Sequence, residues 1–516
     1  MSNRSILKGI PSAAGDLVWR IGEAELGFRP AGIWNSSPSI RNFTGFYELP
    51  HTVTLGTTFE MQESASRFSP PPFAVAVRDE AAKRRTLLNI AAERGHHLFA
   101  TATFAADAEG VTVTVELEGH SDPETERDFI RLELTEAVES ESNLELLKRG
   151  LALAYPEASA PKKKFDWWRL PIFCAGGAGG AFAFHLFGPG GEARCMPFAT
   201  EWMVQRNLDI LKSVDMPIGS VIIDCGWSPG GLWKPHHGYW PDLKGWIAKK
   251  HQEGIKVILW LGLWFTEGLP DKWCLMANPN GKLQYWDPLL NKDTFIDTDK
   301  PERFWADAGN PEYLEFVAQQ IRELVSPDGY DADGFKIDML QMTPCERFAQ
   351  GREHWDKPLK VLPKTHPKTV SGTKWGVELL YDLQKTIHDA AKSVKPDVLV
   401  NSSTGHPYFH DTFDMLRLHD TCHIDAETNV YETMAERAKL SRAALPAHEI
   451  DTDNWIHSYY DKWMDYTLNS YKLGTPCLFF TDYFVTSFTE NPAACPIPRD
   501  DLRKLAANWR KVLDIK

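Results

Sequence analysis

Residues 332–340 read ADGFKIDML, a short apolar run that contains a lysine and ends on an acid. Charged side chains are rarely buried without a partner, so Lys336 and Asp338 in such a strand require an explanation. Alternate residues of a strand share a face, so the two side chains point to the same side. They form a structural ion pair, or they place a catalytic carboxylate at the mouth of a barrel.

The rest of the chain favours a barrel. After residue 166 short apolar segments alternate with amphipathic helical patterns, at 200–213, 311–325, 375–394 and 431–445, and 499–513 reads as the closing helix. The predicted strands are 170–174, 219–224, 255–261, 333–338, 397–401, 414–418, 447–451 and 476–482. Eight strands alternating with helices over about 350 residues predict an α/β fold, a (β/α)8 TIM barrel over residues 166–516.

Residues 1–160 have a different pattern. Segments 51–62, 96–105, 110–120 and 129–138 alternate apolar and polar residues with period two, and turns rich in Gly, Pro, Asp and Ser separate them. This pattern predicts an N-terminal antiparallel β-sandwich domain before the barrel. The composition changes abruptly at EASAPKKKFDWW (157–168), which we interpret as the linker.

Charge and cysteine usage limit the partners. The 516 residues carry a net charge of −14, which disfavours binding to nucleic acid. No apolar run approaches the roughly 20 residues that span a bilayer, and the first residues lack the apolar core of a secretory signal. The eight cysteines are spaced singly, without a CxxC pair, which favours reduced thiols and a cytoplasmic location.

Polar residues gather at the ends of the predicted strands, where TIM barrels carry their chemistry. Six of the eight ends have a carboxylate or carboxamide, and tryptophans stand near several of them. Carboxylates accept hydrogen bonds from sugar hydroxyls and aromatic rings stack on sugar faces, so this mixture predicts a sugar pocket. The candidate pocket residues are Asp224, Cys225, Trp227, Trp260, Trp264, Lys336, Asp338, Asn401, His406, Arg417, Asp420, Asp453 and Asp482.

Each candidate also has a structural interpretation. The tryptophans serve as platforms or as core, and Asp224 binds substrate or forms a helix cap or ion pair. Lys336 keeps Asp338 ionised or binds the same ligand. Cys225 lines the pocket or is an inert filler, and Asp453 lines the pocket or caps a helix.

Three segments resemble clan D α-glycosidases, most closely glycoside hydrolase family 36 (the α-galactosidase-like family) and also family 31. They are VIIDCGW (221–227) with the following YWPDLKGWIAKKHQEGIKVILWL (239–261), GFKIDML (334–340) and MLRLHD (415–420). The resemblance implies that Asp338 is the nucleophile and Asp420 the general acid/base, and that Asp224 and Lys336 bind hydroxyls. It implies a retaining mechanism without a cofactor, and it makes a homo-oligomer plausible.

The chain departs from that pattern at two places. Cys225 stands where the family has a second aspartate, which argues for a sugar other than galactose. Asp420 follows Arg417 by three residues and not four, so Asp425 is a second candidate for the acid/base. We therefore predict a retaining α-glycosidase that hydrolyses a small soluble α-linked glycoside or oligosaccharide through a glycosyl-aspartate.

Other functions fit parts of the sequence. His419 and His423 are four residues apart with acids nearby, a spacing that can bind a metal in a barrel hydrolase. The first predicted strand, however, lacks the His-x-His of such enzymes, and our prediction includes no metal. A transglycosidase and a non-catalytic sugar-binding barrel are the remaining alternatives.

Overall fold

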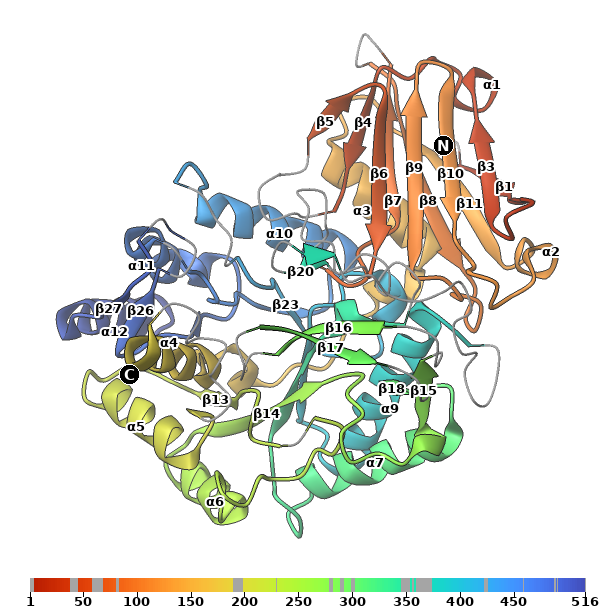
Figure 1. Ribbon diagram of the computed structural model, residues 1–516. Coiled ribbons are helices and arrows are strands. Elements are labelled where there is room, and N and C mark those ends of the chain that lie inside the picture. The colour runs from red at the N-terminus through yellow and green to blue at the C-terminus, as the bar shows by residue number, and fades with distance from the viewer. Residues whose placement is uncertain are drawn as a thin grey trace.

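The computed structural model in Figure 1 shows a mainly β N-terminal part beside a larger α/β part. The structure describes residues 4–37, 45–57, 68–79, 83–188, 198–228, 230–277, 282–287, 292–297, 302–344, 353–354, 357–358, 374–421, 426–457, 459–486, 489 and 491–515.

The N-terminal part is an antiparallel sandwich, as predicted. Its strands are β1 (Arg4–Lys8), β2 (Ile10–Pro11), β3 (Leu17–Ile21), β4 (Gly32–Asn35), β5 (Phe46–Glu48), β6 (His51–Gly56), β7 (Ala74–Arg78), β8 (Arg85–Ala92), β9 (Thr101–Asp107), β10 (Gly110–Val115) and β11 (Ile130–Glu136). One sheet has the order β1-β11-β8-β7-β4-β5 and the other β2-β3-β10-β9-β6. In β3, Leu17, Trp19 and Ile21 are buried while Arg20 is exposed, because alternate residues face the core.

The larger part confirms the TIM barrel. Its parallel strands are β12 (Ile172–Cys174), β13 (Ser220–Ile223), β14 (Lys256–Gly262), β19 (Gly334–Asp338), β22 (Leu399–Ser402), β23 (Met415–Arg417), β24 (Glu449–Asp451) and β25 (Cys477–Leu478). They form one sheet in the order β24-β23-β22-β19-β14-β13-β12-β25. A parallel bridge between Asp451 and Thr475 brings the two outer strands together, so the sheet is nearly closed. Each strand falls within or beside a segment predicted from its apolar run.

Helices cover the barrel in Figure 1. They are α4 (Ala175–Phe187), α5 (Glu201–Lys212), α6 (Leu243–Gln252), α7 (Pro311–Val325), α9 (Val377–Val394), α10 (Val430–Ala444), α11 (Tyr460–Asn469) and α12 (Arg499–Val512), while α1 (Glu23–Leu26), α2 (Pro123–Glu126) and α3 (Asn143–Ala154) precede it. The five predicted helices correspond to α5, α7, α9, α10 and α12. Helix α7 begins where Asn310 accepts a hydrogen bond from the Glu312 amide and Pro311 occupies the first turn, a favourable helix start.

Short hairpins interrupt the barrel alternation and were not predicted. Between β14 and β19, β15 (Cys274–Ala277) pairs with β18 (Glu302–Ala306) and β16 (Lys282–Asp287) pairs with β17 (Lys292–Asp297). Two further pairs are β20 (Glu353–His354) with β21 (Lys357–Pro358) and β26 (Tyr483–Val485) with β27 (Ala494–Pro496).

The sandwich supplies the start of barrel helix α9. The Val377 amide donates to the Phe99 carbonyl at 2.9 Å, and the Glu378 amide donates to the His97 carbonyl at 3.0 Å. Gly376 has a φ of 58°, and a Cβ there would lie 2.5 Å from the Phe99 carbonyl carbon. Helix α9 therefore begins on backbone oxygens of the other domain, which satisfy amides that a helix start leaves unpaired.

The division of the chain near residues 160–166 stays a prediction; the last sandwich strand ends at Glu136 and the first barrel strand begins at Ile172. Among the described residues no helix has the length and apolarity needed to cross a membrane.

Candidate active site

Asp338 ends strand β19, and two donors hold its carboxylate. Arg417 Nη2 donates to Oδ1 at 2.9 Å and the Trp260 indole Nε1 donates to Oδ2 at 3.0 Å. Burial alone would raise the pKa of Asp338, but the positive charges of Arg417 and Lys336 outweigh it and hold the pKa well below its usual range. The side chain keeps 19% of its surface exposed. Asp338 is therefore an ionised carboxylate that a ligand can reach.

Arg417, at the end of β23, joins Asp338 to two further acids. Its Nη1 donates to Asp420 Oδ1 at 3.1 Å and to Asp453 Oδ2 at 2.9 Å. The guanidinium side chain is 2% exposed, while that of Asp420 is 30% exposed. One buried cation thus holds the predicted nucleophile and the predicted acid/base in the same cluster.

Hydrogen bonds from helix α10 hold the loop after β23. Arg437 Nη1 donates to the carbonyl oxygens of Leu418, His419 and Asp420 at 2.9, 2.8 and 3.1 Å. His419 has a φ of 67°, an uncommon backbone conformation for a residue other than glycine. This anchoring places Asp420 beside Arg417.

A second cluster lies around Asp224, directly after β13. The Lys336 ammonium donates to Asp224 Oδ2 at 2.7 Å, the Cys174 thiol donates to the same oxygen at 2.9 Å, and the Cys225 amide donates to Oδ1 at 2.8 Å. Burial opposes both charges, but their attraction outweighs it and raises the pKa of Lys336 while lowering that of Asp224. The direct partner of Lys336 is therefore Asp224, although its charge also lowers the pKa of Asp338.

A third, fully buried cluster joins the ends of β22 and β24. Asn401 Nδ2 donates to Asp451 Oδ2 at 2.6 Å, and the Asp453 amide donates to Asp451 Oδ1 at 2.9 Å. Burial, and then the negative charge of Asp453, raises the pKa of Asp451 to about 6. Asn401 and Asp453 thus lie within the barrel end, where Asp453 supports Arg417 and Asn401 supports Asp451.

We expect Asp451 to make stability depend on pH. An ordinary aspartate loses its proton near pH 4 when unfolded, whereas folded Asp451 keeps it to about pH 6. The folded state binds more protons between these values, so this group lowers the free energy of unfolding as pH rises through both of them, by about 3 kcal/mol in total. Urea unfolding of Asp451→Asn and the natural protein at several pH values measures this.

The difference in stability between the two proteins should change over that range in favour of Asp451→Asn at the higher pH. Effects of acids that do not interact with Asp451 are common to both proteins and cancel in the difference. A difference that stays constant between pH 4 and 7 would contradict the raised pKa.

A known family model matches the barrel part of the chain. Residues 188–470 match the glycosyl hydrolases family 31 TIM-barrel domain, which is more than half of the chain. The chain belongs to glycoside hydrolase family 31. This is the second of the two families that the sequence resembles, and a specific relation to family 36 is not shown. An α-xylosidase, XylQ of Lactiplantibacillus pentosus, is 25% identical over 156 residues, which are 28% of this chain and 19% of that enzyme.

Solved structures share the fold of this family 31 chain. The cycloalternan-degrading enzyme of Trueperella pyogenes matches 98% of the chain and 69% of its own, with a TM-score of 0.59 and 14% identity. TtGalA, an α-galactosidase of Thermus thermophilus, matches over 98% and 99%, with a TM-score of 0.53 and 13% identity. A family 31 sulfoquinovosidase of E. rectale matches over 96% and 67%, with a TM-score of 0.57 and 13% identity.

Two predicted platforms of the family 31 chain are core residues. Trp227 is 0% exposed, and its indole donates to the Trp260 carbonyl at 2.7 Å. Trp264 is 2% exposed. The platform interpretation is therefore wrong for both, because a buried ring offers no face to a sugar. Trp260 is also largely buried, at 7%, and contacts the site through its indole nitrogen.

His406 is not a pocket residue. It is 0% exposed and lies among aromatic rings of the sandwich, with its ring centroid 5.4 Å from Phe73 and 5.2 Å from His97. Burial lowers the pKa of His406 to about 3, so the ring is neutral. Its position after β22 is explained by packing between the two domains.

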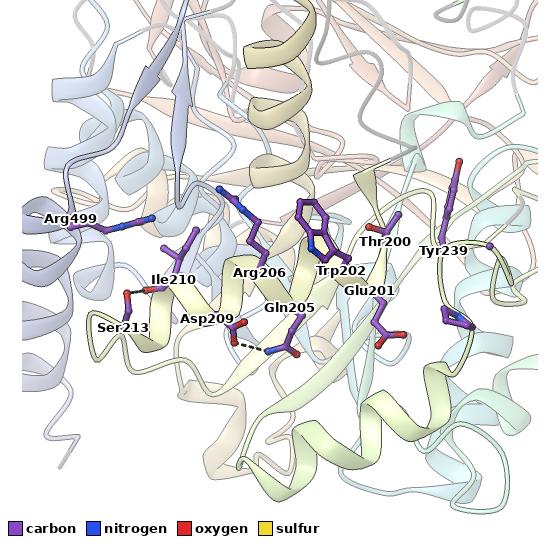
Figure 2. Close-up of a pocket in the computed structure, with 12 residues that line it drawn as sticks. Thr200, Glu201, Trp202, Gln205, Arg206, Asp209, Ile210, Ser213, Tyr239 and Arg499 are labelled. Carbon is purple, nitrogen blue, oxygen red and sulfur yellow. Dashed lines mark hydrogen bonds between the residues drawn. The ribbon is translucent and has the colours of Figure 1, made fainter.

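Asp482 is bound by two arginines away from the three clusters. Arg206 contacts its Oδ2, and Arg499 Nη2 donates to Oδ1 at 3.1 Å. Both arginines line an open groove of about 1030 Å³ along α5, and Figure 2 shows the exposed Trp202 among the side chains that line it. The described contacts of Asp482 give it a structural role at this groove and none with the other predicted residues.

The two remaining alternatives depend on residues 422–425. Asp425 and His423 lie outside the described residues, so the structure places neither the second acid/base candidate nor the second histidine of the metal alternative. Within the described part of the chain, no group of three or more His, Cys, Asp or Glu side chains has the arrangement of a metal site.

Sequence reasoning missed Cys174 as a member of the Asp224 cluster. It is the last residue of β12, and the rule that chemistry gathers at strand ends would have included it. Its thiol was interpreted only as one of eight reduced cysteines.

Proposed function

We propose that this protein is a retaining α-glycosidase that cleaves a small α-linked glycoside or oligosaccharide through a covalent bond to Asp338. The observation that carries the proposal is the state of Asp338 at the end of β19, where it is partly buried beside cations, ionised, and still accessible to a ligand. An ionised carboxylate is what nucleophilic attack on an anomeric carbon requires.

In the first step Asp338 attacks the anomeric carbon and the glycosidic bond breaks. Asp420 donates its proton to the departing oxygen, which leaves as an alcohol. In the second step Asp420 removes a proton from water, and the resulting hydroxide displaces Asp338 from the sugar. Two inversions at the same carbon give net retention. Arg417 supports this cycle because it holds both carboxylates in one cluster.

Asp224 and Lys336 are proposed to bind sugar hydroxyls. The sugar itself is proposed to differ from galactose, since residue 225, next to Asp224, is a cysteine where the resembled pattern has a second aspartate, so a thiol stands in place of a carboxylate. The names of the relatives support a range of α-linked sugars, because they include an α-xylosidase, a cycloalternan-degrading enzyme and a sulfoquinovosidase. We propose a cytoplasmic enzyme that needs neither a cofactor nor a metal.

A panel of aryl α-glycosides tests the proposal. We expect at least one to be hydrolysed, with the α-anomer of the free sugar as the first product by NMR. Rapid quenching and intact-mass measurement should detect one glycosyl adduct, and peptide mapping should locate it on Asp338. A β-anomer as the first product, or an adduct on another residue, would overturn the retaining mechanism through Asp338.

A further inference from the structure

Helix α4 begins immediately after β12 with the unusual sequence AGGAGG, residues 175–180. Glycine within a helix costs about 1 kcal/mol relative to alanine, so glycines there usually have a packing reason. At Gly176 the reason is the site itself. A Cβ at this residue would lie 2.7 Å from Asp224 Cγ and 2.9 Å from Asp224 Cβ, distances that such atoms do not adopt. The side chain of Asp224 thus occupies the space that any other residue at 176 would need.

The other contacts of Asp224 leave it little freedom to move. Lys336 and the Cys174 thiol both donate to Oδ2, and the Cys225 amide donates to Oδ1. A carboxylate has about four acceptor positions. Three are used, so one position on Oδ1 is left for a ligand, and the side chain is 11% exposed.

We propose that Gly176 and Cys174 are positioning residues. They orient Asp224 so that its carboxylate accepts a hydrogen bond from one sugar hydroxyl. Gly176 leaves the space for the carboxylate, and the Cys174 thiol fixes Oδ2 beside Lys336, so only Oδ1 faces the substrate. The inference rests on the proposed function and deepens it, because it assigns part of the sugar specificity to the first turn of α4.

A methyl group at residue 176 would force the carboxylate of Asp224 away from α4. Lys336 is 3% exposed and would then lose the direct partner of its charge. Separating a buried pair is costly because both ions have left water. The free acceptor position on Asp224 Oδ1 would also move away from the substrate. The sugar hydroxyl that donates to it would then lose its hydrogen-bond acceptor.

Gly176→Ala tests this against Gly179→Ala, a matched change on the same helix. A Cβ at Gly179 would lie 3.5 Å from its nearest neighbour, the Phe198 carbonyl oxygen, which is an ordinary contact. In crystal structures of the two variants we expect Asp224 to leave hydrogen-bonding distance of Lys336 Nζ only in Gly176→Ala. An Asp224 carboxylate that stays in place in Gly176→Ala overturns the proposal.

Kinetics with monodeoxy substrates add a second measurement, because a purely structural role of Gly176 would not change the preference for one hydroxyl. The substrates are the aryl glycoside that the enzyme hydrolyses and its monodeoxy analogues. Removing the hydroxyl that binds to Asp224 should lower kcat/KM about 10- to 100-fold in the natural protein, which is the range expected for a hydrogen bond to a charged group. This penalty should vanish in Gly176→Ala and remain in Gly179→Ala. A penalty that is the same in both variants contradicts a role in specificity.

Cys174 gives an independent pair of variants in case Gly176→Ala does not fold. Cys174→Ser keeps a donor to Asp224 Oδ2 and should retain the deoxy penalty, whereas Cys174→Ala removes the donor and should reduce it. Equal penalties in the two variants would overturn the role of the thiol.

The proposed glycosidase function and the proposed role of Gly176 can be disproved separately. If the natural protein hydrolyses no glycoside, the proposed function fails, while the Asp224 position in the crystal structures still decides whether Gly176 sets it. If glycosides are cleaved and Asp224 does not respond to Gly176→Ala, only the inference fails.

Discussion

Asp338→Asn is expected to lower kcat for the best aryl glycoside by about 10⁴-fold or more, because it removes the group that forms the covalent intermediate. Asparagine keeps the shape of aspartate, and its single side-chain oxygen can still accept from Arg417 or from Trp260, although the amide nitrogen cannot accept from the other donor. Substrate binding should therefore change less than turnover. The measurement is kcat and KM on the aryl glycoside, together with the intact mass after a rapid quench. The glycosyl adduct should be absent.

Asp328→Asn is the matched control, since it makes the same chemical change at an exposed residue shortly before β19. It should leave kcat within about twofold. Activity in Asp338→Asn close to that of the control would eliminate Asp338 as the nucleophile. It would then favour a non-catalytic sugar-binding role for the clusters at the strand ends.

Asp420→Asn should produce the second largest effect, and one that depends on the leaving group. General acid catalysis contributes roughly 10²–10⁴-fold. This contribution matters for an alkyl leaving group, which needs a proton, and much less for a nitrophenolate, which does not. We therefore expect kcat/KM to fall about 10³-fold for alkyl or sugar leaving groups, with a small change for dinitrophenyl glycosides.

Azide provides a positive result for the same variant. It needs no deprotonation, so it should attack the glycosyl intermediate of Asp420→Asn and give a glycosyl azide of retained configuration. Asp425→Asn is the comparison that separates the two acid/base candidates. If leaving-group dependence and azide product occur in Asp425→Asn and not in Asp420→Asn, the assignment moves to Asp425.

The fold was predictable because its signals are local. Each barrel strand is a short apolar run, and sandwich strands such as β9 and β10 alternate with period two, so both domains could be assigned without knowledge of tertiary contacts. The hairpins between β14 and β19 were missed because they belong to neither repeating pattern. Asp338 was also predictable, since it combines a strand end with an acid on the interior face.

Which side chains contact each other at the strand ends was less predictable than which residues lie there. Period two shows that Lys336 and Asp338 share a face, but it does not show which acid lies across the barrel from the lysine. That acid is Asp224, and Arg417 takes the place next to Asp338. The pocket predictions for Trp227 and His406 were wrong for a related reason. A residue that follows a strand end can lie in the pocket, in the core or at the domain interface, and the sequence position alone does not distinguish these.

The start of α9 on the sandwich bears on how this protein would unfold. The amides of Val377 and Glu378 are satisfied by the Phe99 and His97 carbonyls, so a barrel expressed alone would lose these bonds and expose the buried surface around them to water. We expect one cooperative transition for the two domains in calorimetry, and a truncated barrel that is prone to aggregate. The unit that could be exchanged between proteins by recombination would then be the pair of domains and not the barrel.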